Sequence, residues 1–371
     1  MVLSTIVKGR NIELDIIKGI AIIMMVWGHI GLPGINYISL FHMAVFFIVS
    51  GAVYKGTYSD DICSLTKFVK NKVKSLYIPY AIVAVFFTLM NNFFIRIGFY
   101  DSSVISYQSS NTILVDCIRG LLFARTTQMG GATWFLRALF FVSIFYAFIE
   151  FLLRRIGIKH TRIVQLSVSL ILLCIVAVIK TSVFEWNSSI YYFVSEFTLG
   201  LVCFSFGGLL SRYCVFEKVK TLQFELLILI ASVSVLILYQ LGNISSIGFD
   251  RGDFYSPLFF SISSFCGFVL MFCVASLILR IQISPISKVF IIIGQNTLPV
   301  VLLHLLVFKI GNLFLVWFFN MDSCLISCFP TIYDKIDTNK YVIGLFYLCI
   351  GIIIPVVLNV AKKKLIGKLN G

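Results

Sequence analysis

The chain has 371 residues, of which 59% are hydrophobic and only 12% are charged, and its formal net charge is +14. Soluble domains carry about 25% charged residues, so a chain this apolar needs lipid around much of its surface and is not a soluble single-core protein. Its lysines and arginines gather in short segments between apolar runs, which is typical of charges that hold helix ends in the cytoplasm. We therefore predict no nucleic-acid partner, although the net charge is strongly positive.

The apolar segments, taken in chain order, define the expected fold. A membrane-spanning helix needs about 20 mainly apolar residues. Ten segments fit this length, near 12–32, 37–55, 76–97, 133–153, 162–180, 190–210, 222–241, 257–279, 289–317 and 341–361. The sequence thus predicts an all-α, polytopic integral membrane bundle of about ten transmembrane helices. We expect residues 1–371 to form a single membrane domain with no soluble domain appended.

Two segments depart from a simple row of straight helices. Pro299 falls inside the ninth apolar segment and predicts a kink or a break there. The longest connection, 98–132, contains a partly amphipathic stretch from Thr112 to Phe123. This stretch is expected to lie on the outer surface or to re-enter the protein.

The positions of the basic residues predict the orientation of the chain. If the N-terminus is cytoplasmic, 20 of the 30 lysines and arginines fall in inner segments. These are Lys8, Arg10, Lys55, Lys67, Lys70, Lys72, Lys74, Arg154, Arg155, Lys159, Arg162, Arg212, Lys218, Lys220, Arg280, Lys288, Lys362, Lys363, Lys364 and Lys368. The outer loops hold Arg119, Arg125, Lys180, Arg251, Lys335 and Lys340. We predict a multi-pass protein of the cell inner (plasma) membrane, surrounded by membrane lipids, with both termini cytoplasmic.

The first apolar segment carries three ionisable groups, Asp15, Lys18 and His29. Ionisable groups inside a membrane are costly, so each is a candidate for function. Lys18 and His29 are separated by a rotation of roughly 1100°, which places them on one helix face roughly 16 Å apart. Asp15 lies one turn before Lys18 and is positioned to pair with it. For Asp15 and Lys18 the alternative is that both side chains only extend to the interface.

Three of the four histidines, His29, His42 and His304, fall in apolar segments, and His160 lies in a basic loop. An imidazole suits proton transfer near neutral pH. The short turn from 31 to 37 predicts that His29 and His42 are neighbours in space. The chain has no His and Cys cluster with zinc-site spacing, so no metal is predicted.

Two motifs of the chain resemble the membrane acyltransferase 3 family. The first is Lys18, ten further residues and His29, and the second is the segment Phe41 to Gly51. That family has Arg or Lys, ten residues and His in its first helix, and an F-H-M-P-x-F-F-x-x-S-G-like second helix. The resemblance spans nearly the full chain and is closest to the fucose 4-O-acetylase-like group. It continues in Lys67–Lys74 leading into Tyr77–Tyr80, in Ala132–Leu136, and in Gly294–Leu298 with His304 after it. The chain departs from the family at Ala44, where Pro is usual, and at Lys18, where many members have an Arg that can bind bidentately.

The resemblance implies transfer of an acyl group, usually acetyl from acetyl-CoA, to a carbohydrate hydroxyl of a surface polysaccharide or of its lipid-linked sugar precursor. It implies catalytic roles for His29, as general base or transient acyl carrier, and for His42. Lys18, Lys70, Lys72 and Lys74 are expected to attract the phosphates of coenzyme A, or else only to set topology. Trp134, Asn296 and His304 are expected to contact substrate, and His42 or Asn296 to orient His29 or to stabilise charge. For Trp134 the alternative is interfacial anchoring.

A second function class fits part of the same pattern. A polytopic transporter or flippase for a lipid-linked saccharide also has many helices and intramembrane charges. Such proteins often show internal repeats or paired broken helices. The sequence has no visible repeat and one candidate break, at Pro299, so it favours the enzyme.

Overall fold

Helices and loops make up the computed structural model, which describes residues 11–124, 126–181, 189–213, 221–281, 284–336 and 339–369. These ranges contain no β-strand. The basic residues Lys8, Arg10, Arg125, Lys218 and Lys220, used above to predict the orientation, lie outside them, and the side chain of Lys368 is not described. The fold is the all-α bundle that the sequence predicts.

The helices run in the following order. The α-helices are α1 (Ile12–Ile30), α2 (Ile35–Ser39), α3 (His42–Ala52), α4 (Ile62–Lys72), α5 (Ile78–Leu89), α6 (Asn91–Arg96), α7 (Ser110–Leu121), α8 (Trp134–Arg155), α9 (Thr161–Thr181), α10 (Ser189–Arg212), α12 (Phe224–Ile244), α13 (Pro257–Arg280), α14 (Ser284–Gln295), α15 (Thr297–Phe318) and α16 (Lys340–Leu369). Short 3-10 or π turns are η2 (Gly56–Ser59), η3 (Val73–Tyr77), η4 (Gly131–Thr133), η5 (Phe249–Arg251), η6 (Ser323–Ser327) and η7 (Tyr333–Lys335).

Within the described residues, 9 stretches are long and apolar enough to cross a membrane. α1, with 19 residues, also has the length of a spanning helix but carries Glu13, Asp15 and Lys18. Together they agree with the predicted number of about ten transmembrane helices. The chain is a multi-pass membrane protein.

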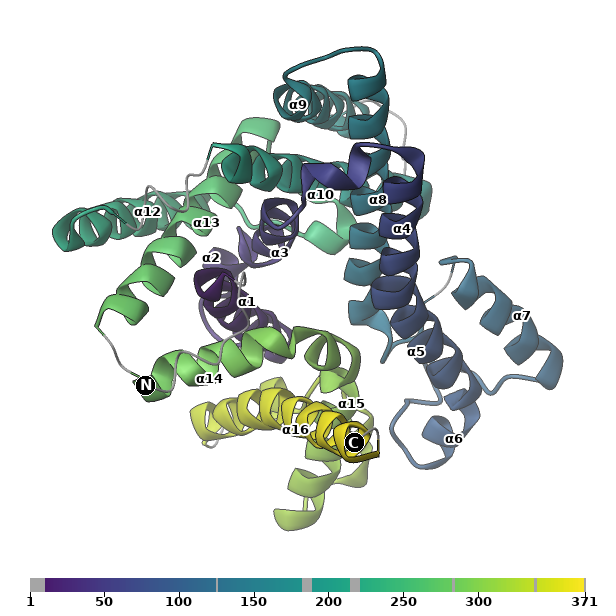
Figure 1. Cartoon of the computed structure of the whole chain (residues 1–371). Helices are drawn as coiled ribbons and strands as arrows, with labels where there is room; N and C mark the ends of the chain where they lie inside the picture. Colours follow the sequence, from purple (N-terminus) through teal and green to yellow (C-terminus); the bar gives the residue numbers. More distant parts are fainter. Residues whose placement is uncertain are drawn as a thin grey trace.

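The first helices of the chain lie at the centre of the bundle (Figure 1). α1 packs against α3, α13, α14, α15 and α16, and α10 packs against α3, α8 and α9. α12 packs on α13 at one side, and the α4–α5 helix packs near α8 at the other. Any site built on α1 and α3 is therefore enclosed by later helices.

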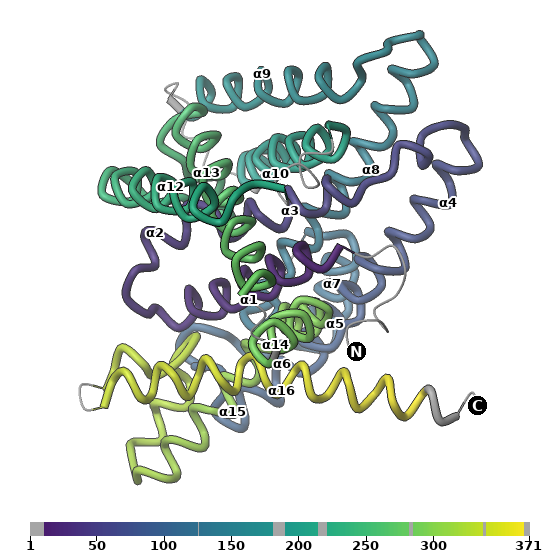
Figure 2. Tube along the Cα trace, turned by 60° about the vertical axis from the view of Figure 1, so that its left-hand side comes forward, coloured from purple at the N-terminus to yellow at the C-terminus, as the bar shows by residue number. Residues whose placement is uncertain are grey.

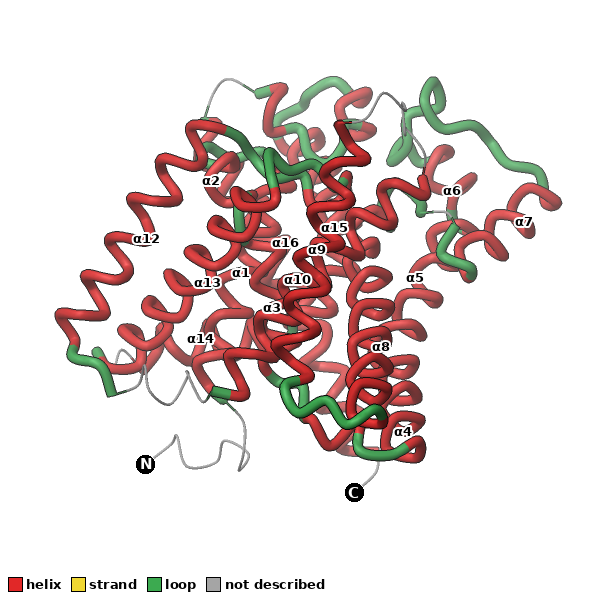
Figure 3. The backbone as a smooth tube through the Cα atoms, turned by 90° about the horizontal axis from the view of Figure 1, so that it is seen from above, coloured by secondary structure: helices red, strands yellow, loops and turns green. Residues whose placement is uncertain are grey.

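The two ends of the bundle differ in their loops. The end where α1 begins and α16 ends, which we call the inner end, has short connections, whereas the opposite or outer end carries the longer loops (Figures 2 and 3). Contacts agree with this arrangement: Gln295 donates to Asp15 at 3.3 Å, and Asn296 accepts from Lys363 at 3.1 Å. Hence the start of α1 and the last turns of α16 meet the same α14–α15 junction.

Glycines let two pairs of central helices approach through their backbones. A Cβ at Gly51 of α3 would overlap the carbonyl oxygen of Phe204 in α10, and one at Gly207 would overlap that of Ile48. Small residues at such crossings allow close helix packing in lipid. α1 and α14 meet in the same way at Gly294, where a Cβ would overlap the carbonyl oxygen of Asp15.

The predicted ninth helix is indeed broken, but the break precedes the proline. α14 ends at Gln295 and α15 begins at Thr297, with Asn296 in a non-helical conformation between them. Pro299 lies in the first turn of α15, where the missing N–H costs no hydrogen bond. The proline therefore fits the start of the second segment.

The predicted third helix begins earlier and ends earlier than expected. α4, the π turn η3 and α5 form one continuous stretch from Ile62 to Leu89, so the basic residues from Lys67 to Lys74 are helical and not part of a loop. Apolar Leu65 and Phe68 are buried in this stretch. The lysines of α4 interrupt its apolar residues, so the hydropathy pattern did not predict it as part of the helix.

The amphipathic stretch in the long outer connection packs against α5 at the edge of the bundle (Figure 1). It forms α7. In the last turn of α7, the carbonyl oxygen of Gly120 accepts a hydrogen bond from the Tyr80 hydroxyl at 2.9 Å, and that of Leu121 accepts one from the Tyr77 hydroxyl at 3.2 Å. Tyr80 lies about 13 Å along the helix below Leu89, the end of α5. α7 thus lies beside the start of α5 with only Asp116 and Gly120 of its residues buried, so it does not enter the interior of the bundle.

Candidate active site

Three histidines from three helices meet near the outer end of α1. His29 lies in the last turn of α1, and His42 is the first residue of α3. The rings of His29 and His304 have centroids 5.0 Å apart. The predicted proximity of His29 and His42 is observed, because both line one cavity.

This histidine cavity has a volume of about 210 Å³. Its lining is mostly apolar, with His29, His42, Ser39, Trp134 and Asp250 as the polar or amphipathic members. The other lining residues are Ile22, Met25, Gly28, Ile35, Met43, Phe46, Ala132, Phe135, Ile247, Phe249 and Val301. A mainly apolar cavity with a few convergent polar groups is the usual form of a small-molecule site.

The tautomer of His42 follows from its hydrogen bond. Its Nδ1 lies 2.9 Å from the carbonyl oxygen of Ile38, so Nδ1 carries the proton that is donated. In the neutral ring Nε2 then holds a lone pair. No side-chain hydrogen bond caps the start of α3, and the positive end of its dipole lies beside the cavity. This side of the cavity therefore favours developing negative charge.

His304 is fully buried and lies behind His29, outside the cavity lining. Its Nδ1 donates to the carbonyl oxygen of Val300 at 2.7 Å. Its Nε2 is buried without a hydrogen-bond partner among the described residues. His304, which was predicted to contact substrate, therefore does not line the cavity and lies against the ring of His29 instead.

Asp250 is brought to the cavity by a tight loop between α12 and α13. Gly248 and Asp253 exchange two backbone hydrogen bonds, at 2.9 and 2.8 Å. Gly252 closes the loop at φ +63, in the left-handed region that favours glycine. Phe249 then stacks on Trp134, with ring centroids 5.7 Å apart, so the loop is fixed against α8.

A second hollow, the arginine pocket, shares Trp134 and Asp250 with the histidine cavity. Its volume is about 650 Å³, and it is lined by Arg137 and Glu196 among mainly apolar residues. Arg137 Nη2 and Glu196 Oε2 form an ion pair of 2.6 Å. The Glu196 side chain is only 3% exposed. A buried carboxylate without its cationic partner strongly destabilises a fold. The ion pair between Arg137 of α8 and Glu196 of α10 therefore holds the two helices together.

The predicted coenzyme A contacts lie away from the histidine cavity. Lys18 pairs with Asp15 at 2.7 Å near the inner end, and 26% of its side chain is exposed. Lys70 and Lys74 are exposed on the α4–α5 stretch, and Lys72 is half-buried with its ammonium over the Phe68 ring. None of the four lines the cavity. Their role in binding the acyl donor stays a prediction.

Asn296 is not brought to the histidines. It lies at the α14–α15 junction, where its amide oxygen accepts from Asn359 at 2.7 Å and from Lys363 at 3.1 Å. Its amide nitrogen donates to the carbonyl oxygen of Ile292. The geometry therefore does not support Asn296 as the group that orients His29, and its substrate contact stays a prediction for the inner end.

Sequence reasoning missed Asp250 and the Arg137–Glu196 pair. Each carried a signal: Asp250 lies in a Gly-Phe-Asp-Arg-Gly-Asp turn, and the pair consists of ionisable residues within apolar segments. Among the described residues, no group of three or more His, Cys, Asp or Glu side chains is placed to hold a metal ion.

The whole chain was also compared with known proteins. A family described as an acyltransferase domain matches residues 11–360. The comparisons with curated proteins and with solved structures found no match. The family match covers nearly the full chain and includes every residue of the histidine cavity.

Proposed function

The chain belongs to the membrane acyltransferase 3 family, and we propose that it transfers acetyl from acetyl-CoA to a hydroxyl of a surface polysaccharide or of its lipid-linked sugar precursor. The observation that carries this proposal is that His29 and His42 line one cavity inside the bundle. Family membership supports acyl transfer in general. The donor, the O-linked product and the acceptor class are parts of the proposal.

The central role in the proposed reaction belongs to His29. Its ring makes no hydrogen bond to the described part of the chain, and it lines the cavity beside His42. A neutral imidazole in this position accepts the proton of the acceptor hydroxyl as that oxygen attacks the thioester carbonyl. The new C–O bond forms, the C–S bond breaks, and the proton passes from His29 to the departing thiolate of coenzyme A.

Stabilisation of the tetrahedral intermediate is the second requirement. Its negative oxygen needs preorganised donors or positive potential in a site from which water is excluded. The uncapped start of α3, with His42 as its first residue, provides positive potential at the cavity wall. His42 acts through this end of the helix, or through Nε2 when its ring is protonated.

The donor is proposed to approach from the inner end. Lys18, Lys70, Lys72 and Lys74 all lie on helices that begin there, and an ammonium group binds phosphate as a point charge. With both termini in the cytoplasm of a cell inner membrane, acetyl-CoA would enter from the cytoplasm. Transfer would then take place toward the outer half of the bundle, where the last turn of α1 holds His29.

The test uses His29→Ala and the matched control His160→Ala, because His160 is an exposed loop histidine. Membranes containing each variant receive labelled acetyl-CoA, and label in the glycan is counted. Loss of the general base lowers acetyl transfer in His29→Ala about 100-fold or more. His160→Ala retains the parent rate.

Protein level in the membrane is measured in parallel, since a misfolded variant would also be inactive. Full transfer activity in His29→Ala at equal protein level would overturn the assignment. Saccharide flux in liposomes without an acyl donor, together with no label in the glycan, would instead establish the flippase.

A further inference from the structure

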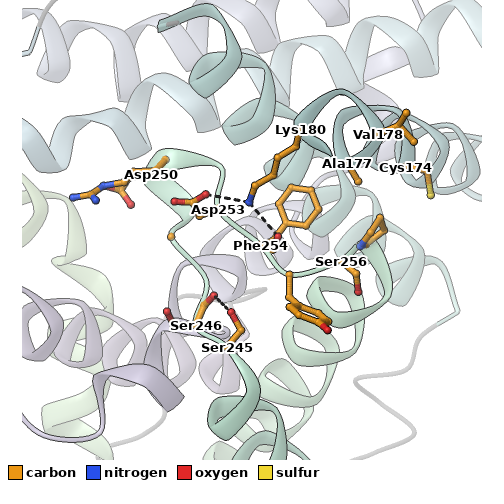
Figure 4. A pocket seen from close by; sticks show the side chains of 14 residues that line it. Cys174, Ala177, Val178, Lys180, Ser245, Ser246, Asp250, Asp253, Phe254 and Ser256 are labelled. Carbon is orange, nitrogen blue, oxygen red and sulfur yellow. Dashed lines mark hydrogen bonds and ion pairs between the residues drawn. The ribbon is translucent and has the colours of Figure 1, made fainter. Parts of the chain in front are cut away.

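A large groove opens at the outer end between α9 and the loop that joins α12 to α13 (Figure 4). We call it the outer groove. Its volume is about 1030 Å³. It is lined by Cys174, Ala177, Val178, Lys180, Ser245, Ser246, Gly248, Asp250, Arg251, Asp253, Phe254, Tyr255, Ser256 and Pro257. Neither the three histidines nor the predicted coenzyme A contacts belong to this lining, so the groove needs an explanation of its own.

The charges in the outer groove are balanced. Lys180 Nζ donates to Asp253 Oδ1 at 3.1 Å and to the carbonyl oxygen of Phe254 at 3.3 Å (Figure 4). Arg251 lies 3.9 Å from Asp250. Of the described lining residues, two carry carboxylates and two carry positive charge, each beside a partner of opposite sign. Such a surface gives no net attraction to a polyanion or a polycation.

The remaining polar groups suit a ligand rich in hydroxyl groups. Ser245 and Ser246 supply hydroxyls that both donate and accept hydrogen bonds, and Tyr255 combines an aromatic face with a phenol. The Tyr255 side chain is 69% exposed at the rim of the groove. An aromatic ring covers the apolar face of a sugar, while carboxylates and hydroxyls satisfy its polar edge.

Asp250 connects this groove to the candidate active site. It lines the outer groove, the histidine cavity and the arginine pocket. The loop that carries it is closed by backbone hydrogen bonds between Gly248 and Asp253 and stacked on Trp134, so its position is fixed. The cavity volume of about 210 Å³ accommodates a ligand of roughly monosaccharide size, and the groove, at about 1030 Å³, has nearly five times that volume.

We infer that the outer groove binds the non-reacting part of an uncharged saccharide acceptor that is longer than one sugar unit. Its acylated unit lies in the histidine cavity, past Asp250, and the following units lie over Tyr255 and the two serines. This inference rests on the proposed function and adds the charge, the minimum length and the path of the acceptor. Binding energy from the units in the groove then holds the reacting hydroxyl at His29.

The experiment places a photocrosslinking benzoylphenylalanine at Tyr255 and, as the matched control, at Tyr341. Tyr341 is 78% exposed and lies in the first turn of α16, which is also at the outer end. Cells that make the full chain are labelled with a tritiated monosaccharide precursor of their surface glycan and irradiated. We expect labelled glycan to be attached at position 255 and not at position 341, and the attached glycan to migrate as an uncharged species.

Repeating the crosslinking in the His29→Ala background separates this inference from the proposed function. Crosslinking at position 255 should persist there, because the groove does not include His29. Tyr255→Ala should lower acetyl transfer about tenfold, equivalent to the loss of one good contact, while Tyr341→Ala retains the parent rate. Absence of acetyl transfer in the parent protein would contradict the proposed function alone.

Three crosslinking results would each overturn the inference about the groove. They are crosslinking to lipid only, equal labelling at positions 255 and 341, and attachment of a charged glycan at position 255. Unchanged acetyl transfer in Tyr255→Ala would do the same, because the groove would then contribute nothing to acceptor binding.

Discussion

His304 lies against His29 with its protonation pattern set by the backbone. Because Nδ1 donates to the carbonyl oxygen of Val300 at 2.7 Å, Nε2 holds a lone pair, and that atom is buried without a partner in the described part of the chain. The two rings are not hydrogen-bonded in the structure, but with centroids 5.0 Å apart a small rotation of the His29 ring would bring an N–H to this lone pair. An N–H···N bond between the two rings would leave the other nitrogen of His29 unprotonated toward the cavity. His304 is therefore expected to be a positioning residue for the base.

Replacement of His304 tests this expectation. His304→Phe keeps a ring of similar volume but has no acceptor for His29, so acetyl transfer should fall by about tenfold or more. His304→Gln restores an acceptor oxygen and should recover part of the rate. The measurement is kcat across a pH series at equal membrane protein level, with a changed pH profile expected for Phe. Equal rates and equal pH profiles for the parent, Phe and Gln forms would show that His304 only fills space.

Asp250 shows why single residues of a site escape sequence reasoning. It is an exposed aspartate in a loop, and most such residues are only solvated. Its importance comes from Phe249, which anchors the loop on Trp134, and from the backbone closure at Gly248. By contrast, His29 and His42 were found from sequence because an imidazole inside an apolar segment is already unusual.

At the scale of elements, the crossing of α3 and α10 fixes the orientation of α3. The two backbones touch at Gly51 and Gly207, where added Cβ atoms would overlap carbonyl oxygens of the facing helix. Lipid supplies no hydrophobic drive between helices, so close van der Waals packing carries this association. α3 also positions His42, and a shift at the crossing would move that residue in the cavity.

Gly207→Ala is predicted to destabilise the fold. The new methyl group overlaps the carbonyl oxygen of Ile48, a backbone atom that cannot move aside alone, so the helices must separate. We expect a loss of about 1–3 kcal/mol or more, seen as a lower melting temperature and a lower yield of monodisperse protein in detergent. Gly131→Ala is the control, since a Cβ there meets nothing within 4 Å. Equal melting temperatures for both variants would contradict the close crossing.

Local sequence predicts that a helix will break, but packing against other helices decides at which residue it breaks. The predicted break at Pro299 occurs at Asn296, where the amide of Asn296 is bound by Asn359 and Lys363 of α16. Similarly, α7 lies beside α5 because Tyr77 and Tyr80 donate hydrogen bonds to carbonyl groups at its end. Both outcomes depend on side chains of other helices, which a local pattern does not contain.

At the scale of the whole molecule, the outer end is held by a buried lysine. Lys309 in α15 is fully buried, and its ammonium donates to the carbonyl oxygens of Ser327 and Cys328 at 2.7 and 2.6 Å. Asn312 donates to Cys328 as well, at 2.9 Å. These bonds satisfy carbonyl groups of an otherwise irregular loop close to lipid, where unsatisfied backbone is costly. They tie the loop before α16 to the bundle.

The orientation in the membrane can be tested with cysteines placed at the two ends. Lys159→Cys lies in an exposed inner-end loop and Lys335→Cys in an exposed outer-end turn, each in a chain whose native cysteines are replaced by serine. Because basic loops stay in the cytoplasm, a membrane-impermeant maleimide added to intact cells should label position 335 and should label position 159 only after lysis. The reverse pattern would place the outer groove in the cytoplasm and exclude the proposed topology.

The sequence by itself determined the membrane class, the approximate number of helices, the family and the histidines, because lipid solvent demands apolar segments of fixed length and makes each ionisable exception visible. Only the tertiary structure decided which helices surround α1 and that His304 lies behind His29 and not in the cavity. It also separated Asn296 from the site and brought Asp250 into it. These facts depend on contacts between residues far apart in the chain, and such contacts are fixed by packing and hydrogen bonding between helices and not by local periodicity.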